Sequence, residues 1–172
     1  SLTYASAGSG STTHLSGELL KVMAQVDIRH VPYKGGGQAL IELVAGQVNM
    51  YFGSMPATLP HVRSGRLRGL AVTSLERAAG APEIPAVTEA GYAGYEAVTW
   101  IGMVLPAGVA PAVVQRLNAE LLQVLGTQEM RDRLHAQGAE ARTGTPAAFA
   151  AYIRSEIGKW AKVVKDAHIA SE

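Results

Sequence analysis

The sequence has no cysteine, which excludes disulfide bonds, thiol catalysis and thiolate metal sites together. It has no excess of one charge either, because 15 Lys and Arg residues stand against 14 Asp and Glu residues. It lacks a basic stripe with aromatic side chains for base stacking, so nothing indicates binding to nucleic acid. No apolar run approaches the roughly 20 residues that a membrane-spanning helix needs. These absences leave small-molecule binding and non-thiol catalysis as the functions to consider.

The residues that are present suffice for a sizeable hydrophobic core. The chain has 172 residues, of which 48% are hydrophobic and 17% are charged, as expected for one ordinary domain or slightly more. It begins at Ser1 without an initiator Met or a signal peptide, so we expect a processed product or a fragment of a longer protein.

The N-terminal part of the chain repeats a pattern of apolar stretch, glycine-rich turn and helix. The predicted strands span residues 2–7, 27–33, 48–52 and 67–73, and helices are predicted to begin after Gly10, Gly37 and Gly53. Ser54 is the expected cap of the third helix, which should end at Ser64–Gly65. This alternation predicts a parallel sheet with right-handed crossovers.

The pattern changes after Ser74, where a polar loop and one helical turn at residues 87–91 precede a long apolar stretch at 95–105. We predict that this stretch is a strand crossing from one lobe to another. Helices are predicted at 111–125, 127–136 and 145–167, with a short extended piece at 139–142. The apolar stripe of the last helix is predicted to be ordinary core packing.

The first glycine-rich turn places Ser9, Gly10, Ser11 and Thr12 at a helix start. The first backbone N–H groups of a helix have no partner within it, and the helix dipole is positive there, so this position suits an anion. A simpler interpretation is that Ser9 or Ser11 only caps the helix. Because the carboxyl ends of parallel strands meet at one edge, three nearly uncharged turns favour a receptor for a small anion over an enzyme.

The motifs of common enzymes are missing. The third glycine of a dinucleotide fingerprint would fall at Thr13, and no Gly-x-Ser-x-Gly run occurs. The five histidines show no i, i+4 spacing for a metal, and each is interpreted as a hydrogen-bonded or surface side chain. A hydrolase using Ser11 and His14 would lack an evident orienting carboxylate. We therefore expect no enzyme activity, no metal and no cofactor.

Seven short runs resemble the tripartite tricarboxylate transporter substrate-binding proteins, also called Bug receptors, over essentially the whole chain. These runs are Tyr4–His14, His30–Gly36, Leu70–Ser74, Pro85–Gly91, Trp100–Gly102, Leu105–Gly108 and Gly144–Pro146. The resemblance implies an α/β, type II periplasmic-binding-protein-like lobe with a parallel-rich sheet flanked by helices. Residues 1–100 would form the second lobe, and residues 101–172 would be the crossover strand and C-terminal helices of an incomplete first lobe.

The resemblance implies a periplasmic receptor that binds a small di- or tricarboxylate and delivers it to the membrane components of a tripartite tricarboxylate transporter. On this sequence the implied ligand-binding residues are Ser9, Gly10, Ser11, Thr12, His14, Tyr33, Gly35, Gly36, Gly53 and Ser54. His14 could also only brace its loop. The run Phe52–Ser54 has no acidic side chain, which favours a plain carboxylate over an amino acid.

Because the rest of the first lobe would lie before Ser1, we expect uncovered apolar surface and self-association with a second copy. One lobe alone is expected to bind its ligand weakly. The alternative is the effector-sensing domain of a transcription regulator, which has the same lobe plan; a winged helix joined to the chain would support it, and none is evident.

Overall fold

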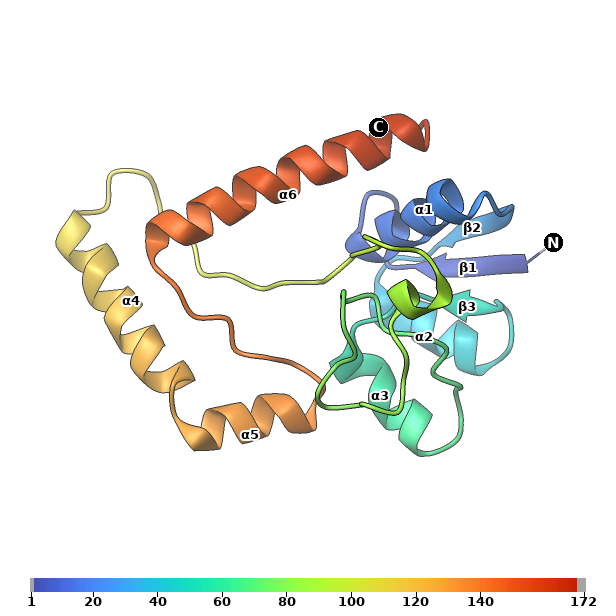
Figure 1. Ribbon diagram of the computed structural model, residues 1–172, viewed down its shortest axis with the longest axis horizontal. Helices are drawn as coiled ribbons and strands as arrows, with labels where there is room; N and C mark the ends of the chain where they lie inside the picture. The colour runs from blue at the N-terminus through green and yellow to red at the C-terminus, as the bar shows by residue number, and fades with distance from the viewer. Residues whose placement is uncertain (1, 170–172) are drawn as a thin grey trace.

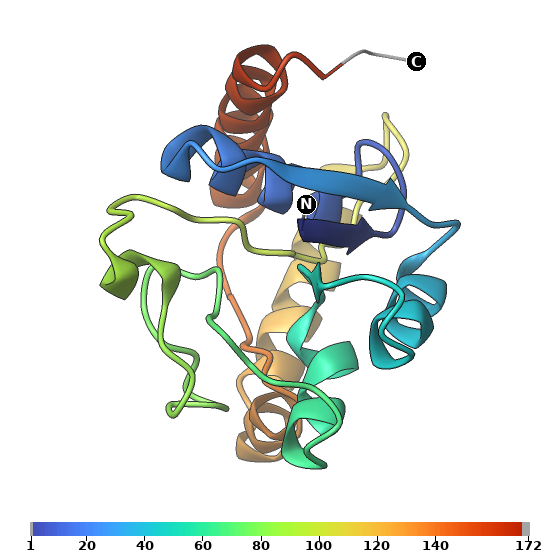
Figure 2. The ribbon, with the colours of Figure 1, turned by 90° about the vertical axis from the view of Figure 1, so that its right-hand side faces the viewer.

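Within residues 2–169, which the computed structural model describes, one sheet has the strand order β2–β1–β3. β1 (Leu2–Ser6) pairs in parallel with β2 (Ile28–Pro32) over its whole length, and on its other side with β3 (Met50–Tyr51). Figure 2 shows β1 and β2 side by side and pointing the same way. The predicted α/β class with a parallel sheet is confirmed.

Helices α1 (Thr12–Ala24) and α2 (Gly36–Val44) cover opposite faces of this sheet. Tyr4 and Ala5 are neighbours in β1, so their side chains point to opposite faces. Tyr4 packs against Gly17 of α1, whereas Ala5 shares a buried cluster with Ala39 of α2. The crossover from β1 to β2 and the crossover from β2 to β3 run in opposite directions across the sheet, and right-handed connections of this kind place helices on both faces.

The predicted helix starts agree closely with the structure. Ser11 is the N-cap of α1, and its hydroxyl accepts a hydrogen bond from the N–H of His14 at 3.3 Å. Gly35, with φ 140°, precedes α2 in a conformation that favours glycine. Ser54 is the N-cap residue of α3 (Met55–Arg63), although its side chain makes no capping bond, and this helix ends at Ser64 as predicted.

The remaining elements are η1 (Val87–Ala90), α4 (Pro111–Leu125), α5 (Gln128–Ala136) and α6 (Pro146–Asp166). The predicted helical turn and all three predicted helices are confirmed. In Figure 1, α4 lies far from the sheet, whereas α6 returns so that its C-terminal part lies over α1. α5 lies near α3, where Arg63 donates from Nη1 to the carbonyl of Ala136 at 3.2 Å.

Two strand predictions in the N-terminal part are wrong: one strand is shorter than predicted, and the other is absent from the described chain. The strand predicted at 48–52 is limited to Met50–Tyr51, because the Asn49 side chain accepts from the Thr3 N–H at 2.8 Å and replaces a ladder bond there. The segment 67–73 forms no strand. Val72 makes a single bridge to Ala86, and Leu70 is 64% exposed, so this segment does not extend the sheet.

The segment 95–105, predicted to be a crossover strand, pairs with no other strand among the described residues. Ala97 donates to the Thr73 carbonyl at 2.9 Å, but beyond it the backbone of residues 98–105 has no backbone partner in the described chain. The piece at 139–142 has no strand pairing either. A strand needs a neighbouring strand to complete its hydrogen bonds, and none of the described segments forms a ladder with either of these two.

The apolar stripe of α6 is only partly core, which corrects the prediction. Val163 is buried, and Phe149 meets the ring of Trp100 edge-on with centroids 5.6 Å apart. By contrast, Ile157 is 65% exposed. None of the helices described here combines the length and apolar character needed to cross a bilayer.

Candidate functional site

Three loops follow the carboxyl ends of the three parallel strands and lead into helix starts. They are the β1–α1 loop (7–11), the β2–α2 loop (33–35) and the β3–α3 loop (52–54). The connections from β1 and β2 leave in opposite directions across the sheet, so the carboxyl ends of β1 and β3 flank a topological switch point. Ligands of open parallel sheets bind in this kind of position.

The β1–α1 loop is held by hydrogen bonds to its own neighbours. Ser11 Oγ caps α1 by accepting from the His14 N–H, which confirms the capping interpretation for Ser11, and the same hydroxyl donates to the Gly8 carbonyl at 2.6 Å. Thr13 Oγ1 accepts from the Ala7 N–H at 2.8 Å and lies 2.9 Å from Ser11 Oγ. These two hydroxyls therefore fix the shape of the loop.

Other polar groups of the same loop remain without a partner among residues 2–169. The backbone N–H groups of Ser9, Thr12 and Thr13 make no hydrogen bond there, nor do the hydroxyls of Ser9 and Thr12. Thr12 and Thr13 are the first two residues of α1, where a helix leaves its N–H groups free. The loop thus presents several donors and the positive end of a helix dipole to an incoming anion.

The second loop adds further free donors next to the first. Tyr33 donates from its N–H to the Ser6 carbonyl at 3.1 Å, which ties the β2–α2 loop to the end of β1. The N–H groups of Gly35 and Gly36 have no partner in the described chain, and a Cβ at Gly36 would lie 2.8 Å from the Tyr51 hydroxyl. Close approach of this kind explains a glycine at position 36.

The third loop is joined to the others mainly through Tyr51. A Cβ at Gly53 would lie 2.5 Å from the Tyr51 ring, so Gly53 lets the chain pass this side chain. Ser54 is exposed, and its hydroxyl has no partner among the described residues. The structure therefore brings the first two loops into direct contact and places Ser54 at the same edge of the sheet.

His14 lies in the buried layer under the loop, away from solvent. Its Nδ1 accepts a hydrogen bond from the Gly10 N–H at 3.1 Å, and its Nε2 lies 3.9 Å from Glu18 Oε1. Burial lowers the pKa of His14, although the carboxylate of Glu18 opposes that shift. His14 thus braces the loop from inside, and the N–H of Gly10 is already used.

A cluster of buried polar side chains around His14 did not emerge from the sequence. The His14 and His30 rings stack with centroids 3.9 Å apart, and Tyr4 stacks on His30 at 5.0 Å. Tyr4 donates from its hydroxyl to Glu18 at 2.6 Å, and burial raises the pKa of Tyr4. Helical spacing brings His14 and Glu18 together on α1, but it could not identify their partners from the sheet. The signal was the strand register that places Tyr4 beside His30.

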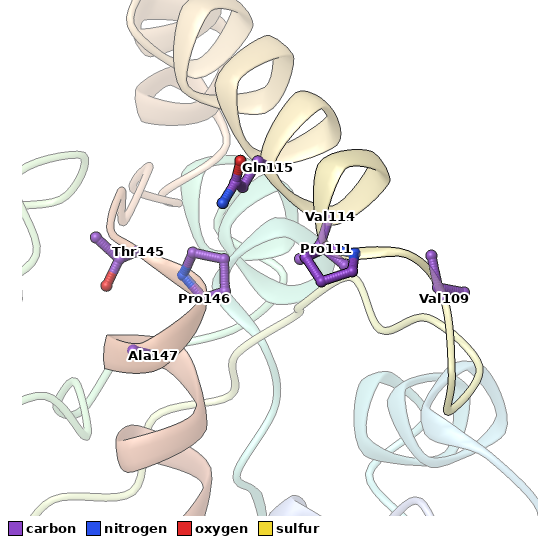
Figure 3. A pocket seen from close by; sticks show the side chains of 7 residues that line it. All are labelled: Val109, Pro111, Val114, Gln115, Thr145, Pro146 and Ala147. Atoms are coloured by element: carbon purple, nitrogen blue, oxygen red, sulfur yellow. The ribbon is translucent and has the colours of Figure 1, made fainter.

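Of two hollows of about 420 Å³ formed by residues 2–169, one touches these loops. The hollow beside the β1–α1 loop is lined by Gly10, Thr12, Leu15, Val98, Trp100, Ile153, Glu156, Ile157 and Trp160. The other lies between the starts of α4 and α6 and contains none of the predicted site residues (Figure 3). The free donors near Thr12 make the first hollow the relevant one. Within residues 2–169, no group of three or more potential metal ligands occurs.

Comparison with known proteins identifies the family. The family model of the tripartite tricarboxylate transporter family receptor, TctC, matches residues 1–169. The chain belongs to this family. The predicted resemblance is therefore confirmed, and the TctC family consists of receptors rather than enzymes.

The relatives of this TctC-family chain differ in length. A protein of the tcbD–tcbE intergenic region of Pseudomonas sp. strain P51 is 38% identical over 95% of this chain and 49% of its own length. A protein of the clcB–clcD intergenic region of Pseudomonas knackmussii is 37% identical over 92% of this chain and 94% of its own length. The chain thus spans about half the length of most curated relatives it matches.

A solved structure has the same fold. The R. palustris protein Rpa4515, determined with adipate, is 37% identical and superposes with a TM-score of 0.92 over 98% of this chain and 56% of that one. The division into lobes at residue 100 stays a prediction, as do the individual ligand-binding residues.

Proposed function

We propose that this chain is part of a periplasmic receptor that binds a small carboxylate, with a di- or tricarboxylate as the expected ligand. The observation that carries the proposal is the set of free backbone N–H groups at the starts of α1 and α2, next to free hydroxyls at one sheet edge. Family membership and the adipate bound by an R. palustris relative support it. The receptor would deliver its ligand to the membrane components of a tripartite tricarboxylate transporter.

The proposed mechanism is binding followed by closure, without chemical change to the ligand. A carboxylate at a helix start gains about 0.3–1 kcal/mol from the dipole, and each charge-assisted hydrogen bond adds about 1.5–3 kcal/mol. Micromolar affinity needs about −8 kcal/mol, so donors from a second lobe are required and hinge closure would supply them. This chain alone should bind at about the millimolar level, which corresponds to about −4 kcal/mol.

Replacing Thr12 by Pro tests the role of the backbone donors. Thr12 is the first residue of α1, where proline is tolerated, and Ser11 before it is extended with φ −67° and ψ 158°, as proline requires. The change therefore removes one free N–H, together with the free hydroxyl of Thr12, while keeping the helix. We expect Thr12→Pro to raise the dissociation constant for adipate at least about tenfold, because one charge-assisted hydrogen bond is lost.

Gln128→Pro is the matched control, because Gln128 is the first residue of α5 and also follows an extended cap residue. It should leave adipate binding unchanged. Binding is measured by chemical-shift titration of the labelled chain with adipate. If Thr12→Pro binds as well as the parent chain, or if the parent chain binds no carboxylate even at high concentration, the proposal is wrong.

A further inference from the structure

Both glycines of the β1–α1 loop are held by buried side chains beneath it. Gly8 donates from its N–H to Ser6 Oγ at 3.1 Å, and the same Oγ lies 2.6 Å from His30 Nε2. Gly10 donates from its N–H to His14 Nδ1 at 3.1 Å. Because His14 and His30 stack on each other, the two attachments form one unit under the loop.

The two histidines differ in what protonation would do. Nδ1 of His14 accepts the Gly10 N–H, so it must carry a lone pair and the ring must be neutral with its proton on Nε2. A proton on Nδ1 would face the N–H of Gly10 and break the bond. Protonated His30 could still donate from Nε2 to Ser6 Oγ, so this attachment survives. Only His14 couples its protonation state directly to the loop.

The surroundings of His14 hold the ring in place. On its own helix, Glu18 Oε1 lies 3.9 Å from His14 Nε2 and is paired with Lys21 Nζ at 2.9 Å. From β1, Tyr4 bonds the same Glu18 oxygen, and from β2, His30 stacks on the ring. Burial lowers the pKa of His14, so the ring is neutral near pH 7 and protonates only in acid.

The geometry points to His14 as a positioning residue that holds the β1–α1 loop in its ligand-binding form through the Gly10 N–H, and that releases it when the imidazole is protonated. This inference rests on the proposed carboxylate function of the same loop. Carboxylate affinity then falls in acid for a reason that lies in the protein rather than in the ligand. Neither Ser9 nor Thr12 needs to change its own protonation for this to happen.

The test is an NMR titration of the full chain from neutral to acidic pH, following the His14 Cε1–H signal and the Gly10 amide together. We expect the Gly10 amide to change shift at the midpoint of His14, while the Gly37 amide, at the start of α2, does not follow that midpoint. His14→Asn places an amide oxygen near the position of Nδ1 without a titrating group, so Gly10 should become independent of pH. His14→Leu should speed Gly10 amide exchange roughly fivefold at neutral pH, as loss of one hydrogen bond does.

His135→Asn, on exposed α5, is the matched control and should behave like the parent chain. A Gly10 amide that does not follow the His14 titration, or that exchanges at the parent rate in His14→Leu, overturns the inference.

Adipate titrations of the parent chain and of His14→Asn are compared at each pH, so that the effect of protonating the ligand itself cancels. A loss of affinity in acid for the parent but not for His14→Asn supports the inference. Equal losses in both overturn it while leaving the receptor function intact. If Gly10 follows His14 but adipate never binds, the proposed function fails and the positioning role stands.

Discussion

At the scale of single residues, His30 is the side chain whose ionisation the fold changes most clearly among the histidines. Burial, together with a smaller effect of the neighbouring His14, lowers the pKa of His30 to about 4, although Glu18 opposes the shift. The half-buried ring packs against both Tyr4 and His14. A charge here would be poorly solvated, so the folded protein strongly favours the neutral ring.

This difference predicts loss of stability in acid. The unfolded chain protonates His30 near its ordinary pKa of about 6.5, whereas the folded chain does so only near 4, so the unfolded state binds more protons between these values. The stabilisation is complete above about pH 6.5 and is lost as the pH falls toward 4, by on the order of 3 kcal/mol in the limit. Urea unfolding at about pH 7 and about pH 5 measures it. His30→Gln should flatten the dependence and His135→Gln should not; equal slopes in all three proteins would contradict the argument.

The residues of the candidate site were only partly predictable. Ser11 as a cap and the free donors of Thr12 follow from local sequence, because a helix start needs only its own first turn. The pairing of His14 with His30 could not be found in this way. It depends on the register of β2 against β1, which a short run of apolar residues does not specify.

At the scale of elements, helices were predicted well and strands poorly for one physical reason. α4 begins at Pro111 and α6 at Pro146, positions where proline is favoured, and helix hydrogen bonds are local. The segments 67–73 and 95–105 have the composition of strands, but in the described chain they make only the isolated Val72–Ala86 bridge and the Ala97–Thr73 bond, and no ladder. An apolar pattern indicates that a segment could form a strand, but whether it does so depends on a neighbouring strand that the pattern does not identify.

Replacing two helical glycines, Gly17 and Gly158, by alanine is predicted to change the stability of the protein in opposite directions. Gly17 lies inside α1, and a Cβ there would fall 2.3 Å from the ring of Tyr4, which is fully buried. Gly158 lies inside α6, and a Cβ there would meet nothing within 4 Å. Gly158→Ala should therefore stabilise the protein by about 0.5–1 kcal/mol, the usual gain of alanine in a helix.

Gly17→Ala should instead destabilise it by about 1–3 kcal/mol, because the clash with Tyr4 exceeds the helix gain. Denaturant unfolding of the two variants beside the parent chain gives both values. A stabilising Gly17→Ala would mean that Tyr4 moves easily, and the buried cluster of Tyr4, Glu18 and His14 would then be less rigid than described.

At the scale of the whole molecule, apolar side chains and unpaired backbone coincide in one region. Ile101 is 98% exposed and Val104 is 75% exposed, within a segment whose backbone has no partner among residues 2–169. Apolar side chains of α4 and α6 are exposed as well, for example Val113 and Ile157. A surface of this kind promotes association, because an extended apolar edge accepts another strand.

We predict that the chain associates with a second copy through residues 98–105, since each copy offers the same unpaired edge to the other around a two-fold axis. Sedimentation velocity over a range of concentrations should show dimers or larger species. Ile101→Lys combined with Val104→Lys should shift the protein to monomer. Ile41→Lys, which changes a residue on α2 that is also largely exposed, should not. A parent chain that stays monomeric at every concentration would contradict the prediction.

The position of β1 at the centre of the sheet has a consequence for how the chain folds. β1 precedes both of its partners, and its pairing with β3 joins Tyr4 to Met50, across the whole of α1, β2 and α2. During synthesis the backbone groups of β1 that pair with β2 and β3 can form these hydrogen bonds only after each of the two strands has been made. The nearer partner, β2, should dock first, and the loop between β1 and α1 then takes its shape before β3 is available. Folding of the candidate site therefore starts from one half of the sheet and is completed by the arrival of β3.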